Sequence, residues 1–80
     1  YINISNYYLK NTKYKKCVQI LEEALDKDIK VKEIYNNLGI AYYATKDNIK
    51  AKTMFEHAIK LDSNYVHALD NLKNINNIEK

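Results

Sequence analysis

The chain of 80 residues contains no arginine, proline or tryptophan, and only one cysteine and one glycine. Its 13 basic residues are therefore all lysines, and the formal net charge is a mild +3. Proteins that read nucleic acid depend on arginine for bidentate contacts to bases and phosphates, so we expect no nucleic-acid partner. The single cysteine, Cys17, cannot form an internal disulfide, which favours a reducing compartment. We therefore expect a cytoplasmic location.

Long apolar runs and targeting segments are also missing. No stretch approaches the roughly 20 apolar residues that a bilayer-spanning helix needs, and no signal-peptide pattern is present, so we expect no membrane association. The first residue is Tyr1 and not methionine, and it stands several residues into the repeat described below. We therefore expect the chain to be a fragment of a larger protein.

The residue patterns that carry chemistry are absent as well. The sequence has no phosphate-binding loop, no nucleophile elbow and no recognisable pair of catalytic carboxylates. Its two imidazoles, His57 and His67, have no histidine, cysteine or carboxylate set at a metal-site spacing. We expect His57 to lie in solvent on an outer helix and His67 to face an inner surface. The sequence thus predicts no enzymatic activity, no cofactor and no metal.

What the sequence does contain is a repeat of 34 residues. When the chain is shifted by that step, large residues fall on large ones and small residues on small ones. Tyr8 falls on Tyr42, Leu21 on Phe55, Ser5 on Gly39, Cys17 on Ala51 and Ala24 on Ala58. A fixed period of this length indicates stacked copies of one supersecondary unit, since a single unit cannot bury its apolar face.

Within each copy, apolar residues recur at the three- and four-residue steps of a buried helix face. The second copy contains the sets Ile34, Leu38, Ala41, Tyr42 and Ala51, Met54, Phe55, Ala58, Ile59; the first contains Ile4, Tyr7, Tyr8 and Cys17, Ile20, Leu21, Ala24, Leu25. This pattern predicts five helices over residues 1–10, 14–27, 32–45, 48–61 and 65–78, packed as antiparallel hairpins. Asp28 and Asp62–Ser63 mark breaks between helices, and the pattern predicts that each can cap the helix that follows it.

The middle copy resembles the tetratricopeptide repeat, because Tyr35, Leu38–Gly39, Tyr42, Ala51, Phe55 and Ala58 occur at that family's offsets. The resemblance implies one all-α domain over residues 1–80. Its architecture would be a right-handed superhelical stack of helix-turn-helix hairpins, an α-solenoid. Repeat one would cover 1–31 and lack its first few residues, repeat two would cover 32–65, and 66–80 would be a cap or the first helix of a third repeat.

The chain departs from the family where glycine and proline are usual. Thr12 and Lys46 replace the glycine of the turn within each hairpin, and Ile29 and Ser63 replace the proline. If those turns keep a left-handed residue, each replacement costs on the order of 1 kcal/mol.

Small residues at equivalent sites are expected to let helix axes approach closely, with Tyr8, Tyr42, Leu21 and Phe55 interlocking between them. This accounts for Gly39, which otherwise costs a helix interior roughly 1 kcal/mol. Cys17 fits the same role as a small apolar residue. The alternative is a reactive thiolate, activated by Lys13 and Lys16 if the thiol were exposed.

The resemblance also implies a function. In this family the first helix of each repeat lines a concave groove that binds peptides, so we expect a protein-interaction module with a protein or peptide partner. The groove positions are Asn6, Leu9, Glu33, Asn36, Ile40, Tyr43, His67 and Asp70. Asn36, Ile40 and Tyr43 share one helix face and are expected to centre the contact.

Several alternatives stay open at this point. Asn6 and Asn37 match two positions of the clamp that grips chaperone C-terminal tails, but Ile2, His67 and Asn71 replace its cations, so we do not expect that ligand. The remaining alternatives are RNA binding, as in related helical repeats, and a purely architectural role in a longer array. A lysine group around the first turn is either a solvated face or a site for an acidic partner or nucleic acid, comprising Lys10, Lys13, Lys15 and Lys16.

Overall fold

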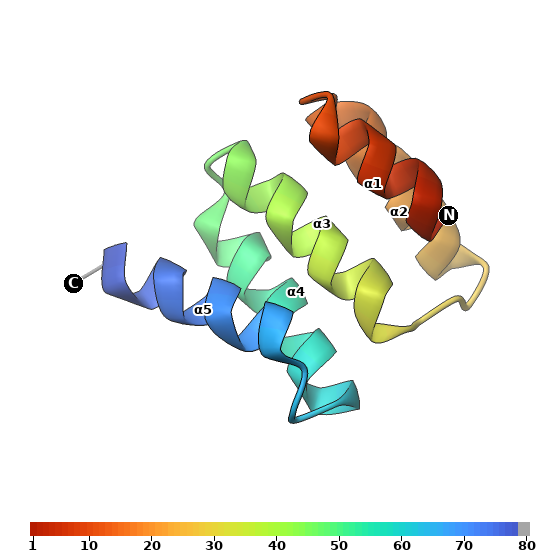
Figure 1. The fold of residues 1–80 in the computed structure, drawn as a ribbon. Helices are drawn as coiled ribbons and strands as arrows, with labels where there is room; N and C mark the ends of the chain where they lie inside the picture. Colours follow the sequence, from red (N-terminus) through yellow and green to blue (C-terminus); the bar gives the residue numbers. More distant parts are fainter. Residues whose placement is uncertain (79–80) are drawn as a thin grey trace.

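Five helices follow one another along residues 1–78, the part of the chain that the computed structural model describes (Figure 1). They are α1 (Ile2–Lys10), α2 (Tyr14–Asp26), α3 (Lys32–Ala44), α4 (Asn48–Leu61) and α5 (Val66–Ile78). The predicted helices are confirmed, and every predicted end lies within one residue of the observed one. None of these five helices has the length and apolar character of a bilayer-spanning segment.

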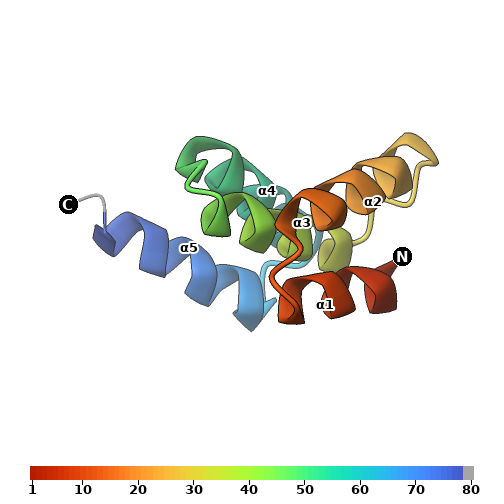
Figure 2. The same ribbon diagram turned by 90° about the horizontal axis from the view of Figure 1, so that it is seen from above.

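The helices form two layers of a short stack. Figure 2 shows α2 and α4 along one side and α1 and α5 along the other, with α3 between them. α3 contacts each of the other four helices, whereas α1 and α5 lie apart on either side of it. The start of α1 and the end of α5 lie at opposite ends of the stack (Figure 1). The predicted all-α stack of antiparallel hairpins is thus confirmed, and α3 is its central element.

The core consists of two clusters related by the 34-residue step. In the first, Cys17, Leu21 and Ala24 of α2 pack against α3 through Ile34, Leu38 and Ala41. In the second, the equivalent residues of α4 pack against α5, and the members are Ala51, Phe55, Ala58, Ala68 and Ile75. The repeat in the sequence is therefore a repeat of one helix-helix interface, as nearest-neighbour stacking requires.

One prediction about the core is wrong. Ile4 and Tyr7 were expected on the buried face of the first helix, but they are 49% and 59% exposed. Their equivalents one repeat later, Leu38 and Ala41, are buried because α2 covers that face of α3. Among residues 1–78 no helix occupies the corresponding place against α1, so its face stays open.

The small residues behave as expected, since Ser5, Gly39 and the small members of α2 and α4 are all buried. Cys17 is fully buried, and its Sγ donates to the backbone oxygen of Ser5 at 3.7 Å. Burial raises the pKa of the Cys17 thiol to about 11. The thiol is therefore protonated at neutral pH and inaccessible, which supports its structural role over the nucleophilic alternative.

The turns contain three residues in the left-handed region. Thr12, Asp28 and Lys46 have φ of 57°, 62° and 67°. Thr12 and Lys46 stand where the family has glycine, so both turns keep a left-handed residue and the cost of a side chain there applies. Asp28, two residues beyond the end of α2, has the same conformation and does not cap α3, whose N-cap is Val31 without a side-chain bond. That capping prediction was wrong, because three further residues separate Asp28 from the helix.

Asp62 also fails to cap the following helix. Its Oδ1 accepts from the backbone N–H of Asn64 at 3.0 Å, within the loop that precedes α5. Its second oxygen accepts from the ammonium group of Lys32 at the start of α3. Asp62 therefore joins the loop before α5 to the first turn of α3, which its position in the sequence does not reveal.

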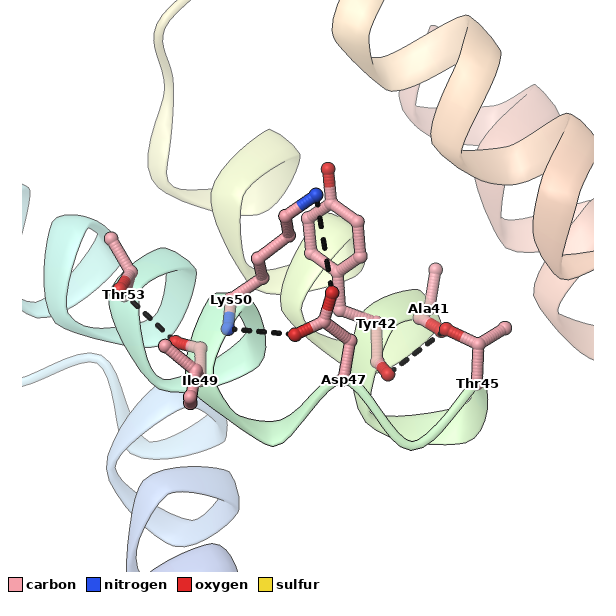
Figure 3. Close-up of polar contacts among 7 residues, drawn as sticks. All are labelled: Ala41, Tyr42, Thr45, Asp47, Ile49, Lys50 and Thr53. Carbon is pink, nitrogen blue, oxygen red and sulfur yellow. Dashed lines mark hydrogen bonds and ion pairs between the residues drawn. The ribbon is translucent and has the colours of Figure 1, made fainter.

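The turn between α3 and α4 is closed by side chains from both sides (Figure 3). Thr45 Oγ1 donates to the carbonyl oxygens of Ala41 at 3.1 Å and Tyr42 at 3.0 Å. Asp47 caps α4 by accepting from the backbone N–H of Lys50 at 3.3 Å. The Lys50 ammonium lies 5.5 Å from the centroid of the Tyr42 ring. These contacts hold the second hairpin together despite the strained residue at its tip.

Candidate functional site

The inner side of the stack contains a hollow of about 300 Å³, which we call the inner hollow. It lies where α1, α3 and the start of α5 converge. Its lining residues are Ile2, Asn6, Glu33, Asn36, Asn37, Ile40, Tyr65 and His67. Several of them are repeat equivalents: Ile2 matches Asn36, Asn6 matches Ile40, and Glu33 matches His67. The hollow is therefore built from the same face of successive inner helices.

The structure brings five of the eight predicted groove residues together in this hollow, namely Asn6, Glu33, Asn36, Ile40 and His67. The other three do not line it. Leu9 packs against the first core cluster and Tyr43 against the second, while Asp70 is exposed on α5. Of the three residues expected to centre the contact, Asn36 and Ile40 line the hollow, whereas Tyr43 packs against the second core cluster.

Amide side chains link the three inner helices across the hollow. Asn37 Nδ2 donates to Ser5 Oγ and to Asn6 Oδ1, both at 2.9 Å, which ties α3 to α1. Asn71 Nδ2 donates to Asn36 Oδ1 at 3.1 Å, which ties α5 to α3. Asn36 and Asn37 are 5% and 8% exposed. The carbonyl ends of Asn6 and Asn36 are thus already used within the protein.

The amide nitrogens of Asn6 and Asn36 remain as donors. Within residues 1–78 no hydrogen bond uses either Nδ2 group. The hollow therefore contains two amide N–H groups that no group of residues 1–78 accepts from. The bridging role of Asn37 and Asn71 was missed, although Asn71 stands one repeat after Asn37 and that equivalence was visible in the sequence.

A charged pair borders the hollow. The Lys32 ammonium donates to the Asp62 carboxylate and lies 5.0 Å from the centroid of the Tyr65 ring. This hydrogen bond raises the pKa of Lys32 and, together with the Asn64 backbone N–H, lowers the pKa of Asp62. Burial, and then the negative charge of Glu33, raises the pKa of Tyr65. Lys32 is therefore held at the rim by Asp62.

Tyr65 also meets His67 edge-on, with ring centroids 5.5 Å apart. Tyr65 was not among the predicted groove residues, although the predicted last helix began at it; in the structure it lies just before α5, as its repeat equivalent Val31 lies just before α3. His67 is exposed on the inner side, as expected. His57 is exposed on α4, as predicted, and it stacks on the Tyr35 ring with centroids 5.0 Å apart.

The lysine group forms a separate surface. Lys13, Lys15 and Lys16 line a second hollow of about 350 Å³ with Thr12 and Tyr14, at the turn after α1. The inner hollow shares no lining residue with it. In the part of the chain that is described, no three histidine, cysteine, aspartate or glutamate side chains are placed to hold a metal ion.

The tetratricopeptide repeat model matches residues 1–26 and 32–65, which are the segments that contain the two helical hairpins. The chain belongs to the tetratricopeptide repeat family. The match confirms the resemblance seen in the sequence, and the inner hollow of this tetratricopeptide repeat chain lies on the side formed by the first helices of its repeats.

Two curated relatives are similar to part of the chain. The uncharacterized protein ycf37 of Porphyra purpurea is 42% identical over 45 residues, which cover 56% of this chain and 26% of the relative. The protein of the same name from Pyropia yezoensis is 39% identical over 51 residues, covering 64% of this chain and 29% of the relative. The chain thus spans less than a third of the length of these relatives.

Proposed function

We propose that this chain is a protein-interaction module that binds an extended segment of a partner protein in the inner hollow. The observation that carries the proposal is the convergence of five predicted groove residues from three helices on one hollow. Tetratricopeptide repeats generally mediate protein-protein contacts, and the family membership supports the same class of function.

The chemistry of the hollow suits a peptide backbone. The Nδ2 groups of Asn6 and Asn36 are donors, and the carbonyl oxygens of an extended peptide are regularly spaced acceptors. Ile2 and Ile40 contribute apolar surface to the same hollow. A volume of about 300 Å³ lies at the lower end of the range for ligand sites, so it accommodates one or two side chains of a longer segment.

A chaperone C-terminal carboxylate does not fit this hollow. No lysine lines it, and the Lys32 ammonium at its rim is bonded to Asp62. Glu33 would repel the carboxylate, and a buried anion without a partner is strongly disfavoured.

The test uses amide NMR spectra of the labelled chain. One sample is titrated with a pool of N-acetylated, C-amidated random dodecapeptides, and another with a pool of random single-stranded RNA dodecamers. We expect the peptide pool to shift the side-chain amide signals of Asn6 and Asn36. His67→Ala should weaken this binding, whereas His57→Ala, which alters an exposed imidazole on the outer helix α4, should not.

Two outcomes would contradict the proposal. Shifts confined to Lys13, Lys15 and Lys16, produced by RNA and abolished by salt, would place the site at the basic turn and favour nucleic-acid binding. The absence of any shift with either pool would favour an architectural role. The absence of enzymatic activity and the cytoplasmic location stay predictions.

A further inference from the structure

The charge of the inner hollow is opposite to that of the chain. Glu33 is the only carboxylate among the lining residues, and no lysine is among them, although the chain as a whole carries a formal charge of +3. The hollow is thus a local acidic site on a basic protein.

The Glu33 carboxylate takes part in no ion pair within residues 1–78, although its charge helps to raise the pKa of the neighbouring Lys32. Its sequence neighbour Lys32 is held by Asp62 and by the Tyr65 ring. An incoming cation therefore does not have to displace an existing partner from Glu33.

The groups around Glu33 suit a cation attached to an aliphatic stem. Tyr65 lines the hollow and already has the Lys32 ammonium near its ring, which shows that this ring can take part in cation–π contact. Ile2 and Ile40 offer apolar surface in the same hollow. Lysine and arginine side chains place a long apolar stem along such surface while the charged end meets a carboxylate.

We propose that the inner hollow binds a lysine or arginine side chain of an extended partner segment, with the cationic end against Glu33 and the stem along Ile2 and Ile40. This inference rests on the proposed function and specifies the chemistry of the partner. The hollow would therefore prefer cationic side chains, whereas the clamp for chaperone C-terminal tails prefers an anionic carboxylate.

The experiment is an affinity selection on the intact chain. The probe is a pool of random dodecapeptides balanced in lysine plus arginine and aspartate plus glutamate, with N-acetyl and C-amide ends so that terminal charges cannot compete. We expect lysine and arginine to be enriched in the bound pool. Glu33→Gln should remove the enrichment and weaken the best basic peptide about two- to fivefold, the range for a partly exposed ion pair.

Glu56→Gln is the matched control, because it removes the same charge from an exposed position on the outer helix α4. Enrichment of acidic peptides would overturn the inference, as would enrichment that survives Glu33→Gln or falls equally with Glu56→Gln. Selection of uncharged peptides that shift the Asn6 and Asn36 signals would overturn this inference and leave the proposed function standing. Retention of no peptide would overturn both.

Discussion

The ring of Phe55 lies directly against the Cα atom of Gly39. A Cβ atom added at residue 39 would lie 2.6 Å from Phe55 Cε1 and 2.7 Å from Cδ1, which is closer than Cβ atoms come to ring carbons. Phe55 is 1% exposed and therefore cannot swing away into solvent. Gly39 is thus required by the approach of α4 to α3, and the cost of a glycine within a helix is offset by this packing.

Gly39→Ala should therefore destabilise the protein by about 1–3 kcal/mol, the usual cost of overpacking. Helix propensity alone predicts the opposite sign, a gain of about 1 kcal/mol.

The first repeat suggests a compensating substitution, since Ser5 and Leu21 occupy the positions of Gly39 and Phe55. Gly39→Ser should destabilise the parent chain. The same substitution should destabilise the Phe55→Leu variant by a smaller amount. Denaturant unfolding of the double-mutant cycle measures this coupling, and additive effects would contradict the close-packing account.

The two repeats also allow one core position to be tested with and without its covering helix. Leu38→Ala should cost about 2–5 kcal/mol, because Leu38 is 1% exposed between α2 and α3. Ile4→Ala removes an apolar side chain from the equivalent position of α1, but Ile4 is 49% exposed, so the cost should be below about 1 kcal/mol. Thermal unfolding of both variants gives the comparison. Equal losses would show that a part of the protein covers Ile4.

The helices and the core of α2 to α5 could be predicted from sequence because each depends on local periodicity repeated after 34 residues. The exposure of Ile4 and Tyr7 could not, because periodicity identifies an apolar face and does not say whether a neighbour covers it. The same limit applies to the hollow. The repeat register predicts that Asn36 and Ile40 lie on the inner side of α3, but the hydrogen bond between Asn36 and Asn71 depends on how α5 packs against α3.

The strained residue in the turn of the second hairpin offers a substitution that should stabilise the protein. Lys46 has φ of 67° and is exposed, and an L-residue in this region costs about 1 kcal/mol or more. Lys46→Gly should raise the free energy of unfolding by about 0.5–1 kcal/mol, since relief of strain exceeds the added freedom of the unfolded chain. Lys46→Ala is the control, because it removes the same charge and keeps the Cβ atom. A similar gain in both variants would attribute the effect to charge.

The Lys32–Asp62 pair should make stability depend on pH at both ends of the range. The pKa of Asp62 is lowered in the folded state, chiefly by the hydrogen bond from Lys32. Its contribution is therefore present above the unfolded value of about 3.9 and is lost as the pH falls through the folded value. The pKa of Lys32 is raised by the same bond, so its contribution is present below about 10.4 and is lost as the pH rises through the folded value.

Denaturant unfolding between pH 6 and pH 2.5 should accordingly show a smaller acid loss in Asp62→Asn than in the parent chain. Asparagine can still accept the backbone bond from Asn64, so the difference isolates the charge. Lys32→Gln should reduce the acid loss as well, although less completely, because the Asn64 N–H also lowers the pKa of Asp62. Since the side chains of the pair are only about a third exposed, 0.5 M salt should screen it incompletely. An acid profile unchanged in Asp62→Asn would mean that this pair does not join the loop before α5 to the start of α3 in solution.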